Sequence, residues 1–177
     1  MPSGKTHDAI TFLTAVPAFA GTFVLTRSVA AAAVVTAAYL FGGLMFGPDL
    51  DTVSVQHSRW SIFSFLWFPY RAFFKHRSRF SHGLIFGALL RVVYFLGVVT
   101  IVAVGCVLIR NAVIGGQTPE FQDIARLWQQ AGEYSRAHFG PNILLLIFLG
   151  TWLGAASHTF TDVAGSFIRT GRVAKFL

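Results

Sequence analysis

Long apolar runs constrain the fold of this chain more than any other feature. Residues 29–47, 83–109 and 142–163 are each long enough to cross the hydrocarbon core of a bilayer, which takes roughly 17 to 25 helical residues. A fourth run, residues 9–25, is of marginal length and contains Pro17. Charged residues make up only 12% of the chain, about half the share of a soluble domain. The sequence therefore predicts an all-α integral membrane bundle of about four transmembrane helices.

The first apolar run has a second interpretation, as a secretory signal peptide. Lys5, the short apolar stretch and the small residues at 18–20 are similar to such a signal with its cleavage site. Two residues argue against cleavage, because Asp8 adds an acid to the basic region and His7 would be lost. We therefore expect this run to be retained as a span.

Histidines and aspartates are concentrated where the apolar runs begin or end. We call the side of the membrane where His7 lies the reference face. If the chain crosses four times, each further group of histidines and aspartates also lies at the reference face. Ionisable groups near spans are rare and are usually functional, so the pattern predicts a metal site at one membrane face. The eight candidate donors are His7, Asp8, Asp49, Asp51, His76, His82, His158 and Asp162.

Local spacing supports this prediction at two places. Asp49 and Asp51 follow a predicted span, where acids oppose the helix macrodipole and invite a cation. His158 and Asp162 are four residues apart, so a helix places them one turn apart on the same face. Each pair can donate to a single metal ion.

Residues 60–74 are apolar and could invert the topology if they crossed. They hold eight aromatic rings, but Pro69 interrupts them and Arg71 follows. This density of tryptophan and tyrosine is typical of a membrane interface, so we expect an in-plane segment. No repeat or flexible linker is visible, and residues 1–177 are expected to form one domain.

The long connection at residues 110–141 predicts a second interfacial segment. Thr118, Pro119 and Glu120 supply an N-cap, a first-turn proline and an acid at a helix start. The following residues predict an amphipathic helix lying on the opposite membrane surface. Its apolar side holds Phe121, Ile124, Trp128 and Ala131.

Basic residues predict the orientation. Nine lysines and arginines flank the reference face and four flank the other, which places the reference face and both termini in the cytoplasm of an inner-type membrane. The net charge of +7 also fits contact with the lipid bilayer, with anionic lipid or with an anionic substrate. No nucleic-acid-binding module is recognisable.

Four motifs, SGKTHD, GPDLD, HRSRFSH and SHTFTD, carry a resemblance. They resemble a family of predicted metal-binding bacterial membrane proteins, distantly related to predicted membrane-bound metal-dependent hydrolases. The hydrolase relatives have glycine and threonine at the positions of Ser78 and Ser81. The resemblance covers the whole chain. It implies metal-site roles for His7, Asp49, Asp51, His76, His82, His158 and Asp162, and a weaker role for Asp8.

Imidazole and carboxylate donors without a nearby thiolate favour zinc, with manganese or iron(II) as alternatives. The candidate donors outnumber the four ligands that one tetrahedral zinc ion needs, so the site could hold more than one ion. We predict a metal-dependent hydrolase acting on a membrane-associated substrate, a phosphoester above all. Asp8 or Asp49 would be the general base, and Arg77 would neutralise charge on the substrate. The alternative is a non-catalytic metal-stabilised scaffold or assembly factor; a metal transporter is less favoured, because the donors cluster at one face.

Overall fold

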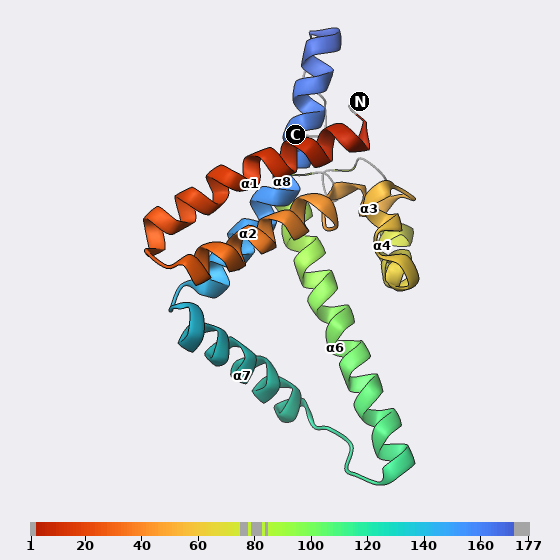
Figure 1. Cartoon of the computed structure of the whole chain (residues 1–177). Helices are drawn as coiled ribbons and strands as arrows, with labels where there is room; N and C mark the ends of the chain where they lie inside the picture. The colour runs from red at the N-terminus through yellow and green to blue at the C-terminus, as the bar shows by residue number, and fades with distance from the viewer. Residues whose placement is uncertain (1–2, 75–77, 79–82, 84, 172–177) are drawn as a thin grey trace.

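The computed structural model describes residues 3–74, 78, 83 and 85–171 (Figure 1). This part of the chain is helical and contains no strand, as the sequence predicts. Along the chain the elements are α1 (Gly4–Thr26), α2 (Val29–Leu44), η1 (Pro48–Asp51), α3 (Val55–Ser58), η2 (Ser61–Trp67), α4 (Phe68–Phe73), α6 (Phe86–Ile114), α7 (Phe121–Phe139) and α8 (Ile143–Thr170).

Three helices are long and apolar enough to cross a membrane, namely α1, α6 and residues Ile143–Ile168 of α8. Four spans are predicted, and α2 is shorter than these three: it has 16 residues, whereas α1 has 23. A fourth span through α2 stays a prediction. Pro17 lies inside α1 without ending it. The chain leaves α2 early because Gly47 and Pro48 begin a 3-10 turn, which a continuous α-helix would not allow.

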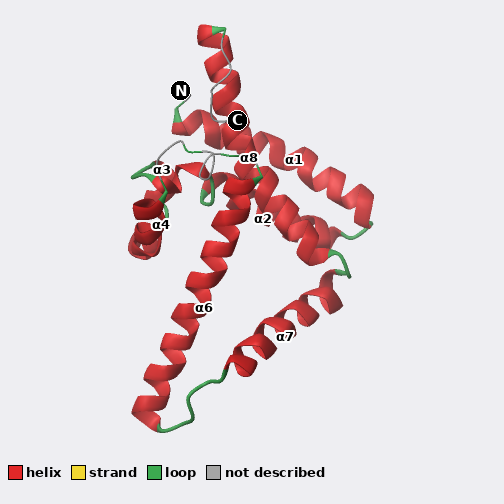
Figure 2. Cartoon of the chain, turned by 180° about the vertical axis from the view of Figure 1, so that it is seen from behind, coloured by secondary structure: helices red, strands yellow, loops and turns green. Residues whose placement is uncertain are grey.

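Helices α1 and α2 form a hairpin that packs against α8 (Figures 1 and 2). Glycines allow α2 and α8 to approach closely: a Cβ at Gly154 would overlap the carbonyl of Tyr39, and a Cβ at Gly42 would overlap that of Thr151. The hairpin turn is capped at both ends, since Arg27 adopts the left-handed conformation and Ser28 accepts a hydrogen bond from Ala31. This three-helix bundle brings the start of α1 and the end of α2 to the same side of α8.

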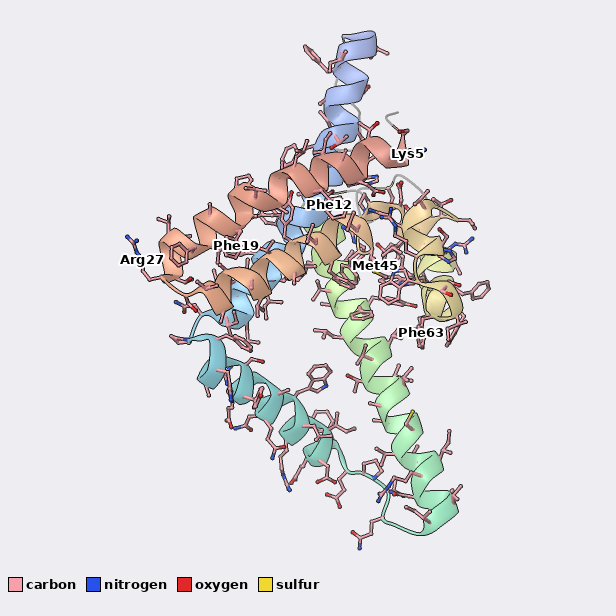
Figure 3. All side chains as sticks on the ribbon, viewed as in Figure 1. Lys5, Phe12, Phe19, Arg27, Met45 and Phe63 are labelled. Atoms are coloured by element: carbon pink, nitrogen blue, oxygen red, sulfur yellow. The ribbon has the colours of Figure 1, made fainter. Side chains whose placement is uncertain are left out.

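Residues 60–74 form two short helices, η2 and α4, of seven and six residues. Neither is long enough to cross a hydrocarbon core. Their aromatic rings do not all lie outside, because Trp67 and Tyr70 are fully buried with Phe46 and Leu50. Exposed apolar residues of the same segment, such as Phe63, point away from the bundle (Figure 3).

Helices α6 and α7 form an arm that extends away from the bundle (Figures 1 and 2). The two helices touch where the Trp128 indole donates to the Thr100 hydroxyl at 3.1 Å. The predicted helix after residue 117 is present, but its N-cap is Glu120 rather than Thr118. Glu120 and Asp123 form a reciprocal capping box, which starts the helix at Phe121.

Candidate metal centre

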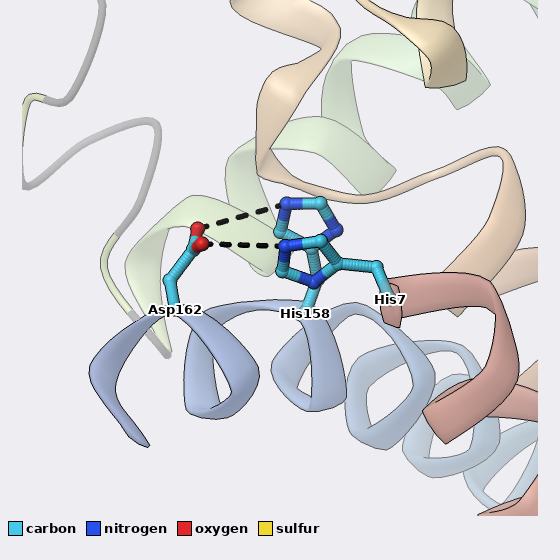
Figure 4. A group of neighbouring side chains, drawn as sticks. All are labelled: His7, His158 and Asp162. Atoms are coloured by element: carbon cyan, nitrogen blue, oxygen red, sulfur yellow. Dashed lines mark ion pairs between the residues drawn. The ribbon is translucent and has the colours of Figure 1, made fainter. Parts of the chain in front are cut away.

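Three buried side chains from the two ends of the chain converge on one point (Figure 4). His7 comes from the first turns of α1, and His158 and Asp162 lie one turn apart on α8. One potential ligand atom of each lies within 4.8 Å of the others. Their exposed fractions are only 7%, 5% and 3%. The structure thus brings together three of the residues predicted to bind metal.

The carboxylate of Asp162 faces both imidazole rings. Its Oδ1 lies 3.3 Å from Nε2 of His7, and its Oδ2 lies 3.7 Å from Nε2 of His158. The two rings are stacked, with centroids 3.8 Å apart and planes at 12°. Stacking therefore aims both Nε2 atoms toward the same acidic group (Figure 4).

Asp49 supplies a second carboxylate at this point. Its Oδ2 lies 3.2 Å from Nε2 of His158, and the side chain is 26% exposed. Asp49 belongs to η1, so the turn that ends α2 early is what carries it to α8.

The first turns of α1 are held in place by capping and by contacts to α8. Ser3 caps the helix through the amide of Thr6. Thr11, which is also buried, donates to the carbonyl of His7 at 3.0 Å and lies 3.4 Å from the hydroxyl of Ser157. These hydroxyl contacts fix the register of His7 against α8, which the sequence spacing alone does not specify.

Asp8, the predicted general base beside His7, contacts a cation. Its carboxylate forms an ion pair with Arg59, and Arg59 also donates to the carbonyl of Leu44 at 2.7 Å. Arg59 therefore ties α1 to the end of α2 through Asp8. The structure supports a structural contribution from Asp8, and its role as a general base stays a prediction.

Asp51 is buried but lies outside the three-residue group, on the side of α4 and α6. Arg91 of α6 is only 2% exposed and interacts electrostatically with the Tyr70 hydroxyl and with the carboxylates of Asp51 and Asp49. Burial raises the pKa of Tyr70, although the nearby Arg91 acts in the opposite direction. Arg91 was recognisable in the sequence only as a charge inside an apolar run.

Several predicted residues fall elsewhere. His76, Arg77 and His82 lie outside the residues that the structure describes. His57, which matches no motif, lies 3.4 Å from a guanidinium nitrogen of Arg71, and partial burial together with this cation lowers the pKa of His57. Helix α8 continues to Thr170, so His158 and Asp162 are interior to it and not near its end as predicted.

The buried atoms of the group fit a bound cation. Within the described part of the chain, Nε2 of His158 and Oδ1 of Asp162, which both lie at the point of convergence, have no hydrogen-bond partner of good geometry. Buried polar atoms in native proteins are normally satisfied, and an ion is one way of satisfying them. Two imidazoles and two carboxylates form a donor set typical of zinc and of other first-row divalent metals.

Comparison with known proteins agrees with this geometry. Residues 2–171 match the family described as "Uncharacterized metal-binding protein (DUF2227)". The chain belongs to this family. A protein of Aquifex aeolicus (strain VF5), described as "Uncharacterized protein", is 39% identical over 57 residues, which is 32% of this chain and 40% of that protein. No solved structure matches the chain. Membership supports metal binding and leaves metal identity, membrane insertion and activity as proposals.

Proposed function

We propose that this chain is an integral membrane, metal-dependent hydrolase that acts on a membrane-associated substrate. The observation that carries the proposal is the buried convergence of His7, His158 and Asp162 beside Asp49. Clustered histidines and carboxylates with buried, incompletely satisfied atoms are the common protein framework for a divalent cation. The exposed apolar surfaces of α1 and α6 support placement of this framework in a bilayer.

Each donor has a chemical task in this proposal. His7, His158 and Asp162 hold the cation together with Asp49, and zinc fits their nitrogen and oxygen atoms. A divalent cation at such a site supplies Lewis acidity and lowers the pKa of water. Asp49 is the most exposed of the four carboxylate and imidazole groups, so it is the side chain best placed to accept a proton from water. Arg77 is proposed to neutralise negative charge on a phosphoester substrate.

The alternative proposal, a metal-stabilised scaffold without catalysis, also draws on one observation. The three converging donors are nearly inaccessible, and structural metal sites are closed whereas catalytic sites keep a position open. Loading the protein with cobalt and adding azide separates the two. A change in the visible spectrum on adding azide supports the hydrolase, and an unchanged spectrum supports the scaffold.

Metal analysis of purified variants tests the donor assignment. We expect His158→Ala and Asp49→Ala to weaken metal binding by about tenfold or more and to lower the melting temperature in detergent, because metal binding and folding are coupled. Arg77→Ala should retain the metal and lose turnover only. His138→Ala is the matched control, since His138 is exposed on α7. The assignment of roles is contradicted if Arg77→Ala loses the metal while His158→Ala and Asp49→Ala retain it fully.

We further propose that the site and both termini face the cytoplasm in the inner membrane, with α1, α2, α6 and α8 as spans. Helix α2 is the shortest, at roughly 24 Å, and would need local thinning of the bilayer. The test uses Gly116→Cys and Ser58→Cys in a Cys106→Ala background, with an impermeant maleimide on intact cells. Labelling of Gly116→Cys alone is expected. Labelling of both from the same side contradicts four spans.

A further inference from the structure

Gln56 lies against the candidate metal centre although no sequence pattern marks it. It belongs to the short helix α3 and is only 4% exposed. Space for its amide exists because residue 47 is glycine: a Cβ there would overlap both Nε2 and Oε1 of Gln56. The same glycine begins the turn that delivers Asp49, so the amide and the carboxylate are positioned by one feature of the backbone.

The amide of Gln56 has a defined orientation. Its Nε2 donates to the carbonyl of Gly43 at 2.8 Å and lies 3.3 Å from Nδ1 of His158. Turning the amide over would place Oε1 against the Gly43 carbonyl, with two acceptors facing each other. The NH2 group has two hydrogens, so the second is available to His158.

This orientation specifies the tautomer of His158 in the absence of metal. If Nδ1 accepts a hydrogen bond from Gln56, the ring hydrogen must be on Nε2. Nε2 faces carboxylate oxygens of Asp49 at 3.2 Å and of Asp162 at 3.7 Å, and both are acceptors. A hydrogen on Nε2 therefore faces acceptors, although neither contact has good hydrogen-bond geometry. Metal binding through Nε2 requires the other tautomer, with the hydrogen on Nδ1.

We infer that Gln56 is a positioning residue for His158 and that the side-chain amide of Gln56 turns over when the site takes up a metal. In the metal-free site the amide donates to Nδ1 and to the Gly43 carbonyl. In the loaded site Oε1 accepts the Nδ1 hydrogen, and the bond to Gly43 is lost, so coordination of the metal must offset that loss. Oε1 is buried and, among the described residues, has no hydrogen-bond partner of good geometry, so turning the amide over breaks no bond at Oε1. Ligating histidines usually donate their second ring N–H to a fixed acceptor. The inference rests on the proposed metal binding at this site.

Nitrogen-15 NMR of the histidine rings tests the metal-free half directly. In protein labelled with ring-15N histidine and stripped by chelator, His158 should show Nε2 protonated and Nδ1 unprotonated. The signals are assigned by their loss in His158→Gln. Adding Zn²⁺ should transfer the hydrogen to Nδ1. A metal-free His158 with its hydrogen on Nδ1 overturns the inference.

Two variants of Gln56 test the positioning role. Gln56→Leu removes the acceptor, and we expect Zn²⁺ to bind about 10 to 100 times more weakly. Gln56→Glu provides a permanent acceptor, so it should retain wild-type affinity or exceed it and show the Nδ1–H tautomer before metal is added. Thr22→Val is the matched control, because Thr22 is buried and bonded to Ala18 on α1 but belongs to no part of the site.

The outcomes separate this inference from the proposed function. Wild-type affinity and an unchanged His158 spectrum in Gln56→Leu overturn the inference while leaving metal binding intact. Failure of the wild-type protein to bind Zn²⁺ at all contradicts the proposed function, and the metal-free spectrum still decides the orientation of the amide. If Gln56 had a purely structural role, its variants would lower the melting temperature, as we expect of Thr22→Val. Gln56→Leu and Gln56→Glu would then not have opposite effects on metal affinity.

Discussion

The three-helix bundle of α1, α2 and α8 and the arm of α6 and α7 differ in what surrounds their side chains. In the most apolar window of α8, 39% of the residues are buried by protein, whereas none are in that of α6. The bundle encloses histidines, aspartates and threonines. Helix α6 of the arm is more hydrophobic than α8, yet its side chains depend on the surrounding medium. Hydropathy therefore identifies helices that could cross a membrane but does not identify which of them build a site.

Close backbone approach accounts for the difference. Where helices carry glycine at their contact, their backbones come near enough for short polar side chains to reach across. Gly42 and Gly154 do this between α2 and α8, and Gly43 lies against Thr11 of α1. In α6, a Cβ added at Gly97 or Gly105 would meet nothing within 4 Å. Gly42, Gly43 and Gly154 are packing positions, whereas Gly97 and Gly105 face open space.

The largest expected effect comes from replacing a closely packed glycine of the bundle with alanine, compared with the same change at an open glycine of α6. Gly154→Ala should destabilise the bundle by about 3 kcal/mol, because the new Cβ meets the backbone of Tyr39 and of Gly43, which cannot rotate away. Gly105→Ala is the matched change in α6 and should stabilise its helix by up to about 1 kcal/mol. Thermal melts of both variants in one detergent measure the difference.

Metal affinity adds a second readout to this pair. Displacing α8 from α2 also moves His158 relative to Asp49, so Gly154→Ala should weaken metal binding while Gly105→Ala leaves it unchanged. Equal melting temperatures for the two variants would mean that the close packing of α2 on α8 does not distinguish the bundle from the arm.

Much of the bundle could be predicted from the sequence. The helices, the apolar runs and the approach of His7, Asp49, His158 and Asp162 all follow from hydropathy and from counting spans. The lengths of α1 and α2 could not be predicted in this way. A proline inside a helix can be accommodated by neighbouring helices, and a turn at Gly-Pro can end one early, so packing decides both.

The contacts of individual side chains also could not be predicted from the sequence. Asp8 and His7 are adjacent, yet Asp8 pairs with Arg59 while His7 stacks on His158. Successive residues of a helix point in different directions, and only the position of α3 determines which one meets a cation. Gln56 escaped notice for a similar reason, because a single amide near a turn has no characteristic spacing.

The smallest expected effect is the loss of one hydroxyl between α1 and α2. The Tyr39 hydroxyl and Thr14 Oγ1 are 2.6 Å apart, and Thr14 donates to the carbonyl of Ile10, so Tyr39 is the donor to Thr14. Tyr39→Phe keeps the buried ring and should cost about 0.6 to 1 kcal/mol, the usual size of one such bond between membrane helices.

Tyr134→Phe on α7 is the matched control for this hydroxyl. Tyr134 is 64% exposed, and its ring stacks on His138 of the same helix, so removing its hydroxyl should change stability by less than about 0.5 kcal/mol. Melts in detergent and after reconstitution into vesicles measure both variants. Because the Tyr39 contact lies within the bundle, its effect should be the same in both media. If Tyr39→Phe is neutral in detergent and destabilising only in vesicles, the bundle depends on the bilayer as the arm does, and the distinction between the two regions fails.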